Sequence, residues 1–213
     1  MHKFDRVYDI TVALGLEAPV YPGDPAYERS LVFSMNRGDE ADVSRLALCS
    51  HSGTHIDLPA HFIQLSPTVE ALPPEEFILP VRVIEVADPL VVTAEELAGY
   101  DLSSRPALLC KTRNSTSGLV VTPQFSEEYV YFSAEAAEHC VMVGLRLVGL
   151  DYYSVDGFGA EGYPAHRILL EAGLYVLEGI NLAAVPPGDY TLICLPLRLD
   201  GCEASPVRAV LLK

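Results

Sequence analysis

Basic residues are scarce in this chain, and long apolar runs are missing. Of its 213 residues, 14 are Lys or Arg against 29 Asp or Glu, a net charge of −15. A surface of that sign repels phosphate backbones. Arg146 interrupts the most apolar internal stretch, residues 140–150, and the first nine residues hold no apolar core of signal-peptide length. We therefore expect a cytoplasmic protein with no nucleic-acid partner and no membrane span.

Cysteines are few and form no pattern. There are five, widely spaced and without a Cys-x-x-Cys pair, so the sequence predicts neither a disulfide framework nor a thiolate zinc site. Cys49, Cys110 and Cys194 lie in apolar, strand-like segments. We expect these three to be small core residues rather than nucleophiles.

Length and composition indicate one folded domain over residues 1–213. The chain is 50% hydrophobic and 20% charged, and it contains no linker, low-complexity tract or internal repeat. Its mean hydropathy of +0.24 is high for a soluble monomer. This value predicts that a partner subunit covers some apolar surface, as in a homodimer.

Short strands outnumber helices in the expected pattern of elements. Strands are expected at residues 8–12, 29–33, 43–48, 81–86, 107–112, 147–151, 174–178, 190–196 and 206–212. Helices are expected at residues 94–98, 134–144 and 164–172. Thr93 and Ser133 are placed to cap the first two helices. This mixture predicts an α/β fold with a mixed, strongly curved β-sheet and few flanking helices.

Residues 51–61 hold the densest group of metal-ligand side chains, in the order His-Ser-Gly-Thr-His-Ile-Asp-Leu-Pro-Ala-His. Three of the six histidines and one aspartate fall in this segment. Neutral imidazole and carboxylate suit Zn²⁺, with Mn²⁺ and Fe²⁺ also compatible, and no thiolate is placed to complete a structural cage. A single histidine is more often a core or surface group than a ligand. The grouping nevertheless favours an open, catalytic metal site.

Backbone signals place these side chains on a turn and a strand rather than on a helix. Gly53 allows a tight turn, and Pro59 disfavours a helix through the segment. Alternate side chains of an extended strand share one face. His55 and Asp57 can therefore point at one ion, with His51 returning from across the turn.

Two further candidate ligands lie in the second half of the chain. Pro164 would begin a helix that places His166 in its first turn, and Glu178 would close the apolar strand at residues 174–178. Each has an ordinary alternative. His166 could be a polar residue of a helix surface, and Glu178 could form a salt bridge or a solvated strand end.

The motif at residues 51–61 resembles the signature of the metal-dependent cyclase and kynurenine formamidase family. The resemblance covers nearly the whole chain and includes residues 9–11, the Tyr-Pro-Gly-Asp loop at 21–24, and residues 151–156, 166–181, 188–197 and 204–211. The last two segments resemble bacterial kynurenine formamidases in particular. The resemblance implies the swivelling β/β/α architecture and a homodimer.

The same resemblance implies a role for each matching residue. The implied metal ligands are His51, His55, Asp57, His166 and Glu178. Asp57 would also bridge two ions, so one or two Zn²⁺ ions are expected, with Mn²⁺ as the other candidate. His61 takes the position of the catalytic acid/base histidine.

Hydrolysis of an amide or formamide follows from such a site. A bound metal lowers the pKa of water and polarises a carbonyl, and His61 would carry the proton to the leaving nitrogen. The resemblance implies N-formyl-L-kynurenine as the substrate, giving kynurenine and formate in tryptophan catabolism. Another cyclic or acyclic amide is an alternative, and so is a non-catalytic metal- or ligand-binding protein. The presence of His61 favours an enzyme.

The substrate-binding residues are less clearly marked. Bacterial kynurenine formamidases usually carry a tryptophan in the aromatic-Pro-Gly-Asp loop, and this chain has no tryptophan. Tyr21 stands there and is the expected substrate-binding residue, able to stack on an aryl group or only to pack within its turn. Arg113 and Asn114 could hold a substrate carboxylate or only cap a loop.

Overall fold

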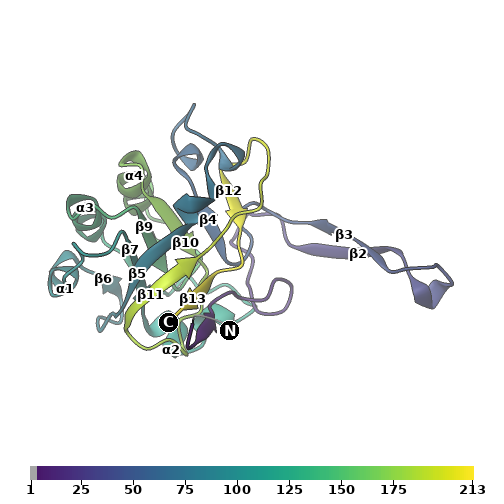
Figure 1. The fold of residues 1–213 in the computed structure, drawn as a ribbon, viewed down its shortest axis with the longest axis horizontal. Coiled ribbons are helices and arrows are strands. Elements are labelled where there is room, and N and C mark those ends of the chain that lie inside the picture. Colours follow the sequence, from purple (N-terminus) through teal and green to yellow (C-terminus); the bar gives the residue numbers. More distant parts are fainter. Residues whose placement is uncertain (1–3) are drawn as a thin grey trace.

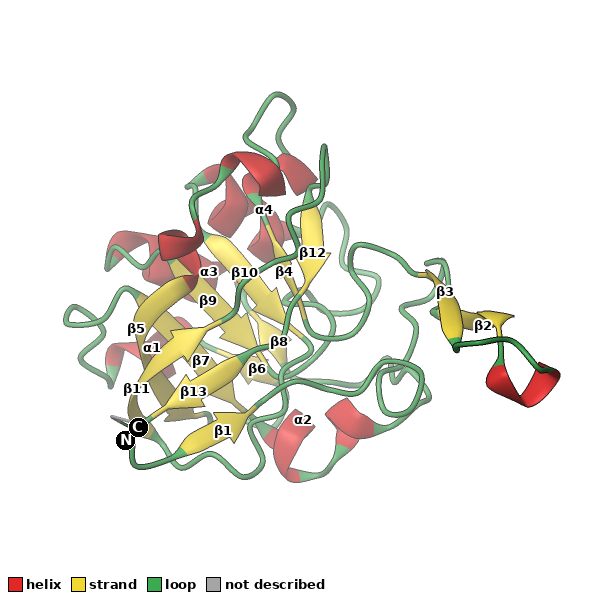
Figure 2. Cartoon of the chain, turned by 45° about the vertical axis from the view of Figure 1, so that its right-hand side comes forward, coloured by secondary structure: helices red, strands yellow, loops and turns green. Residues whose placement is uncertain are grey.

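A mixed β-sheet forms the centre of the computed structural model, which describes residues 4–213 (Figures 1 and 2). In spatial order its strands are β1 (Val7–Asp9), β13 (Val210–Leu212), β11 (Gly188–Ile193), β5 (Ile78–Glu85), β7 (Ala107–Lys111), β9 (Leu147–Leu150), β10 (Tyr175–Glu178), β4 (His55–Asp57) and β12 (Ala204–Pro206). β5, β7, β9 and β10 run parallel to one another, and the other neighbours pair antiparallel. The central strands therefore need crossover connections, which the helices supply.

Three helices pack beside one another on one side of this sheet (Figure 1). They are α1 (Ala94–Ala98), α3 (Ala134–Met142) and α4 (Pro164–Glu171). Thr93 and Ser133 cap α1 and α3 as expected. The Thr93 side chain accepts a hydrogen bond from the backbone amide of Glu96, and the Ser133 side chain accepts one from the amide of Ala136. The smaller elements are α2 (Arg113–Thr116), the strand pair β6 (Val91–Val92) and β8 (Tyr131–Phe132), and the 3-10 turns Met35–Arg37, Pro59–His61, Val69–Ala71, Pro74–Phe77 and Leu119–Val121.

Apolar residues on the two faces of the sheet form two separate clusters. Leu108 joins the cluster under the helices, and its neighbour Leu109 joins the cluster inside the curved sheet. Val176 and Leu177 on β10 divide in the same way. Successive strand residues point to opposite faces, so both faces of the central strands are buried.

The sheet curls until its two ends approach each other. Thr11, just after β1, forms an isolated bridge with Ile180, just after β10, and the amide of Asn181 donates to the carbonyl of Ile10. The amide of Val12 likewise donates to the hydroxyl of Thr54, just before β4. These bonds close much of the curve into a half-barrel, and the expectation of a mixed, strongly curved sheet with few helices is confirmed.

The expected single strand at residues 206–212 is wrong. β12 pairs with β4 at one end of the sheet, whereas β13 lies between β1 and β11 near the other end. Pro206 has no N–H to continue a ladder. The amide of Ala209 instead bonds the side chain of Thr11, so the chain crosses from one end of the curl to the other.

Two of the expected strands form an arm that projects from the body (Figures 1 and 2). β2 (Glu28–Phe33) and β3 (Val43–Ala47) pair only with each other, antiparallel, in a separate two-stranded sheet. We call residues 28–47 the arm. Every residue of β2 is exposed, and so is every residue of β3 except Ala47. The sequence predicts the strands but contains no signal that they leave the core.

The cysteines agree with expectation at two of three positions. Cys110 and Cys194 are buried in the core. Cys49 is only half-buried, because it lies in the loop that leads from the arm back to the body. All five cysteines are free within the described residues 4–213.

In the same part of the chain, no helix has the length and apolar character needed to cross a membrane.

Candidate active site

Strand β4 presents two of the expected ligands on one face. It lies between β10 and β12, and its register pairs His55 with Glu178. His55 and Asp57 point to the same side, and Ile56 between them is buried in the cluster inside the sheet. The turn before β4 requires Gly53, whose φ of +67° lies in the left-handed region. Sheet register therefore brings residues from distant parts of the sequence to one point.

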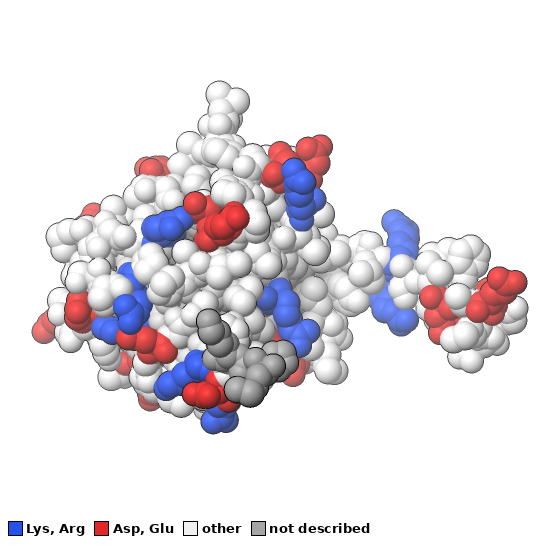
Figure 3. All heavy atoms as spheres, in the orientation of Figure 1, with Lys and Arg blue, Asp and Glu red and all other residues white. Residues whose placement is uncertain are grey.

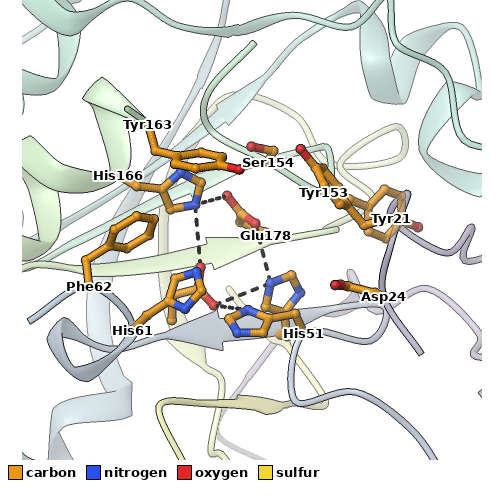
Figure 4. Close-up of a pocket in the computed structure, with 12 residues that line it drawn as sticks. Tyr21, Asp24, His51, His61, Phe62, Tyr153, Ser154, Tyr163, His166 and Glu178 are labelled. Atoms are coloured by element: carbon orange, nitrogen blue, oxygen red, sulfur yellow. Dashed lines mark ion pairs between the residues drawn. The ribbon is translucent and has the colours of Figure 1, made fainter. Parts of the chain in front are cut away.

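A cavity of about 360 Å³ opens over this face (Figure 4). Its lining residues are Tyr21, Asp24, His51, His55, Asp57, His61, Phe62, Tyr153, Ser154, Tyr163, His166 and Glu178. All seven of the site residues expected from the sequence are among them. The five expected ligands and His61 gather at the floor, and aromatic side chains form much of the wall.

Imidazole nitrogens and carboxylate oxygens converge at the floor of the cavity. The Nε2 atom of His55 lies 3.4 Å from Asp57 Oδ1 and 3.4 Å from Glu178 Oε2. The Nε2 atom of His166 lies 3.1 Å from Glu178 Oε1 and 3.6 Å from Asp57 Oδ2. His51 approaches Asp57 Oδ1 with its Nδ1 atom, at 2.8 Å. Asp57 thus stands at the centre of the group.

The donor set fits a divalent metal ion. Both oxygens of Asp57 are buried and, among the described residues, neither has a hydrogen-bond partner of acceptable geometry. Ring nitrogens of His51, His55 and His166 lie 2.8–3.6 Å from these oxygens, so the donor atoms of these residues gather around Asp57. A buried carboxylate left in this way is costly unless a cation compensates it. Three imidazoles and two carboxylates suit Zn²⁺ or another borderline transition metal.

The electrostatics of the group favour positive charge. Burial alone would raise the pKa of Asp57, but His51 and His55 outweigh burial and hold that pKa well below its usual range. Burial also opposes ionisation of Glu178, yet His166 lowers its pKa to about 2. Conversely, burial disfavours a charged His51, but Asp57 raises the pKa of this imidazole to about 9. Two carboxylates that remain ionised in a buried position form a strong cation site.

His61 has a different setting from the other histidines. It ends the 3-10 turn Pro59–His61, and its ring lies 4.3 Å from that of His51 and 4.5 Å from that of Phe62. Burial lowers the pKa of His61 below its ordinary value, with the nearby charges of His51 and His166 acting in the same direction. His61 is therefore poised as a neutral imidazole that can accept a proton.

Aromatic side chains line opposite sides of the cavity (Figure 4). The ring of Tyr21 packs edge-on against Phe125 at 5.1 Å and lies 6.2 Å from Phe158. Across the cavity, Phe62 lies 5.7 Å from Tyr163. Tyr21 therefore packs against Phe125 and Phe158 and also lines the cavity, and its role in substrate binding stays a prediction.

Comparisons with known proteins agree with this site. Residues 8–157, more than half of the chain, match the Cyclase family model. A kynurenine formamidase from Polaromonas naphthalenivorans (strain CJ2) is 35% identical, over 97% of this chain and 90% of that protein. The chain belongs to the cyclase family. The resemblance inferred from residues 51–61 is thereby confirmed.

Two solved structures of family-like hydrolases show the same fold. A predicted metal-dependent hydrolase from Bacillus stearothermophilus is 29% identical with a TM-score of 0.82, covering 97% of this chain and 98% of that one. Isatin hydrolase A from Labrenzia aggregata, bound to benzyl benzoate, is 26% identical with a TM-score of 0.82, covering 97% and 93%. These neighbours confirm the expected architecture and the expectation of a hydrolase.

Sequence reasoning missed several residues of this cyclase-family site. Asp24, Phe62 and Tyr163 line the cavity, and only the adjacency of Phe62 to His61 could have drawn attention to it. Arg113 and Asn114 do not line it. Asn114 is buried and bonds the backbone of residue 130 in both directions, so the loop-capping alternative holds for this side chain.

Proposed function

We propose that this protein is a metal-dependent amidohydrolase that converts N-formyl-L-kynurenine to L-kynurenine and formate. One observation carries the proposal: a buried group of imidazoles and carboxylates, centred on Asp57, lies beside the neutral His61 in an aromatic-walled cavity. Membership of the cyclase family and similarity to kynurenine formamidases support the same reaction.

The proposed metal ligands are His51, His55, Asp57, His166 and Glu178. Asp57 turns one oxygen toward His51 and His55 and the other toward His166, so this carboxylate is placed to bridge two ions. We propose one or two Zn²⁺ ions for each subunit, with Mn²⁺ as the second candidate. The bound metal would supply Lewis-acid chemistry, lowering the pKa of water and polarising the amide carbonyl.

His61 provides the proton transfers of the proposed reaction. As a neutral imidazole it accepts a proton from the attacking water, and as imidazolium it returns a proton to the leaving nitrogen. Its ring lies 4.3 Å from that of His51, and among the described residues no hydrogen bond or ion pair engages it, so the ring is free for this role. The buried Glu178 keeps its charge and also accepts a hydrogen bond from the amide of Val155, which fixes its orientation.

The walls of the cavity suit an aryl amide. About 360 Å³ is enough for one substituted benzene ring with a short side chain. Tyr21 and Phe62 offer aromatic faces on opposite sides, where a substrate ring can stack. We propose Tyr21 as the substrate-binding residue that takes the place of the tryptophan expected in this loop.

The deciding experiment is hydrolysis of N-formyl-L-kynurenine by protein stripped with a chelator and then reconstituted separately with Zn²⁺ and Mn²⁺. We expect metal-dependent appearance of kynurenine with kcat/KM of about 10⁴ M⁻¹s⁻¹ or more. Isatin, a cyclic amide, is assayed in parallel because an isatin hydrolase shares the fold. Turnover of isatin alone would reassign the substrate, and metal binding without turnover of either compound would contradict the proposed activity.

We also propose that the protein is a homodimer held together through the arm. An isolated two-stranded hairpin is marginally stable in water. This arm nevertheless exposes a series of large apolar side chains, namely Leu31, Val32, Phe33, Met35, Val43 and Leu46. Arginine side chains gather midway along the arm and Asp and Glu near its tip (Figure 3), so two arms running in opposite directions would pair opposite charges. A second copy of this chain fits both properties.

Sedimentation analysis tests this assembly. We expect wild-type protein to sediment as a dimer and the double variant Phe33→Asp, Leu46→Asp to sediment as a monomer. The control Leu65→Asp changes an exposed leucine outside the arm and should remain dimeric. A monomeric wild type, or a variant that stays dimeric, would contradict the proposed role of the arm.

Two broader expectations join the proposal. A single domain over residues 1–213 is supported by one sheet that joins the first described strand, β1, to the last, β13, and a single cooperative unfolding transition would test it. A cytoplasmic location rests on the sequence features given above, and cell fractionation would test it.

A further inference from the structure

His51, His55 and His166 each turn one ring nitrogen, the inner one, toward Asp57. The other ring nitrogen, the outer one, lies beside an oxygen atom of another residue. For His55 the outer atom is Nδ1, 2.9 Å from the carbonyl of Gly53. For His166 it is Nδ1, 2.6 Å from Asp156. A carbonyl oxygen only accepts, so the outer nitrogen of His55 carries the proton and the inner nitrogen keeps its lone pair. This is the tautomer that a metal ligand needs.

His51 is held differently from the other two. It turns Nδ1 toward Asp57 and Nε2 outward, where Oε1 of Glu203 lies 3.2 Å away. The same carboxylate oxygen accepts a hydrogen bond of 2.6 Å from the hydroxyl of Ser50. The Glu203 side chain is 36% exposed, whereas Asp156 is buried. The outer partner of His51 is therefore the one that lies at the surface.

The backbone fixes Glu203 opposite the ligand strand. Its carbonyl accepts a hydrogen bond of 3.0 Å from the amide of Leu58, and the next residue, Ala204, pairs with Asp57. The side chain thus starts from a position set by sheet register rather than from a loose loop. A surface ion pair alone contributes little, but an acceptor fixed by register and by Ser50 can select the ring orientation of a histidine.

We propose that Glu203 is a positioning residue for the metal site, which orients His51 and holds the proton on its Nε2 atom so that Nδ1 faces the metal. This inference rests on the proposed metal site, although it makes a separate claim about a residue that touches neither metal nor substrate. Partners of this kind change metal affinity by about 10–100-fold when removed.

The test compares the affinity of four variants and the wild type for Zn²⁺, by competition with a chromophoric chelator. Glu203→Ala should bind Zn²⁺ about 10–100-fold more weakly. Glu203→Gln keeps an oxygen that accepts from Nε2–H and should recover most of the affinity. Ser50→Ala removes one anchor of the carboxylate and should have a smaller effect. Glu70→Ala is the matched control, since Glu70 bonds Thr68 and the amide of Gly201 near the same loop without contacting His51.

A second readout separates orientation from folding. The visible spectrum of the Co²⁺-loaded protein reports ligand geometry, so it should change in Glu203→Ala and remain close to wild type in Glu203→Gln, while the melting temperatures of the metal-free proteins agree. The proposal is overturned if Glu203→Ala binds Zn²⁺ within twofold of wild type, if Gln is as poor as Ala, or if Glu70→Ala loses as much affinity. Asp57→Asn is added to the same assay as a separate test of the metal site. Loss of Zn²⁺ binding in this variant would support the proposed metal site independently of the result for Glu203.

Discussion

Replacing His61 by alanine separates its two conceivable roles. The structure places His61 close enough to His51 and Asp57 to join them as a metal ligand. Its lowered pKa favours an acid/base role instead, and among the described residues no hydrogen bond or ion pair holds its ring. We expect His61→Ala to keep near-normal metal content and to lose turnover by roughly 10²–10⁴-fold.

The size of this effect follows from what the variant loses. A factor of 10²–10⁴ corresponds to about 2.7–5.4 kcal/mol of transition-state stabilisation. The side chain is only partly buried and rests against His51 and Phe62, so its removal should cost about 1 kcal/mol of folding stability or less, in line with a partly exposed group. Turnover should therefore fall far more than stability does.

The assay measures turnover, metal content by elemental analysis and the melting temperature of the same preparations. His139→Ala, a half-buried histidine of α3 outside the cavity, serves as the control and should match wild type. Burial lowers the pKa of His61, so the base stays neutral down to a pH below the ordinary histidine value, and the wild-type rate should fall only when the pH drops through that lowered pKa. That acidic limb should vanish in His61→Ala. Metal loss in step with activity would refute the reasoning and make His61 a ligand.

Three further outcomes are expected at the same site. Asp57→Asn should lose bound metal and activity together, because it removes the central carboxylate; full metal occupancy in this variant, by elemental analysis, would contradict bridging. Chelation of the wild type should lower the melting temperature by roughly 8–16 °C in calorimetry, if metal at about 1,000 times its Kd adds about 4 kcal/mol; an unchanged value would argue against a tight site. Tyr21→Ala should raise KM by about tenfold while Tyr21→Phe stays near wild type, since stacking needs only the ring; equal kinetics for both variants and wild type would remove Tyr21 from substrate binding.

The sequence predicted the chemistry of the site better than the course of the chain. The turn at Gly53 and the alternation of His55 and Asp57 are local properties, readable from proline, glycine and strand period. The helix that carries His166 was equally local, because Pro164 marks its first turn. Such signals depend on residues a few positions apart, which a single sequence displays directly.

Properties that depend on distant partners could not be derived in this way. Residues 206–212 have the composition of one strand, yet Val207 bonds Thr54 beside β4 and Ala209 bonds Thr11 beside β1, so the segment divides between two partners. The alternating pattern of the arm resembles that of core strands, since the sequence does not state what covers an apolar face. Glu203 likewise gives no local sign of its contact with His51, 152 positions earlier.

The three-residue strand β4 has implications for changing the specificity of this protein. Two of its residues, His55 and Asp57, line the floor of the cavity and the third, Ile56, is fully buried in the core, so a substitution at any of the three alters either the floor or the packing beneath it. Tyr21, Phe62 and Tyr163 lie outside the strands, in connecting segments. Under the proposed function, reactivity and selectivity would therefore reside in separable parts of the chain. A mutant library confined to those segments could explore new amides while the catalytic floor stays constant.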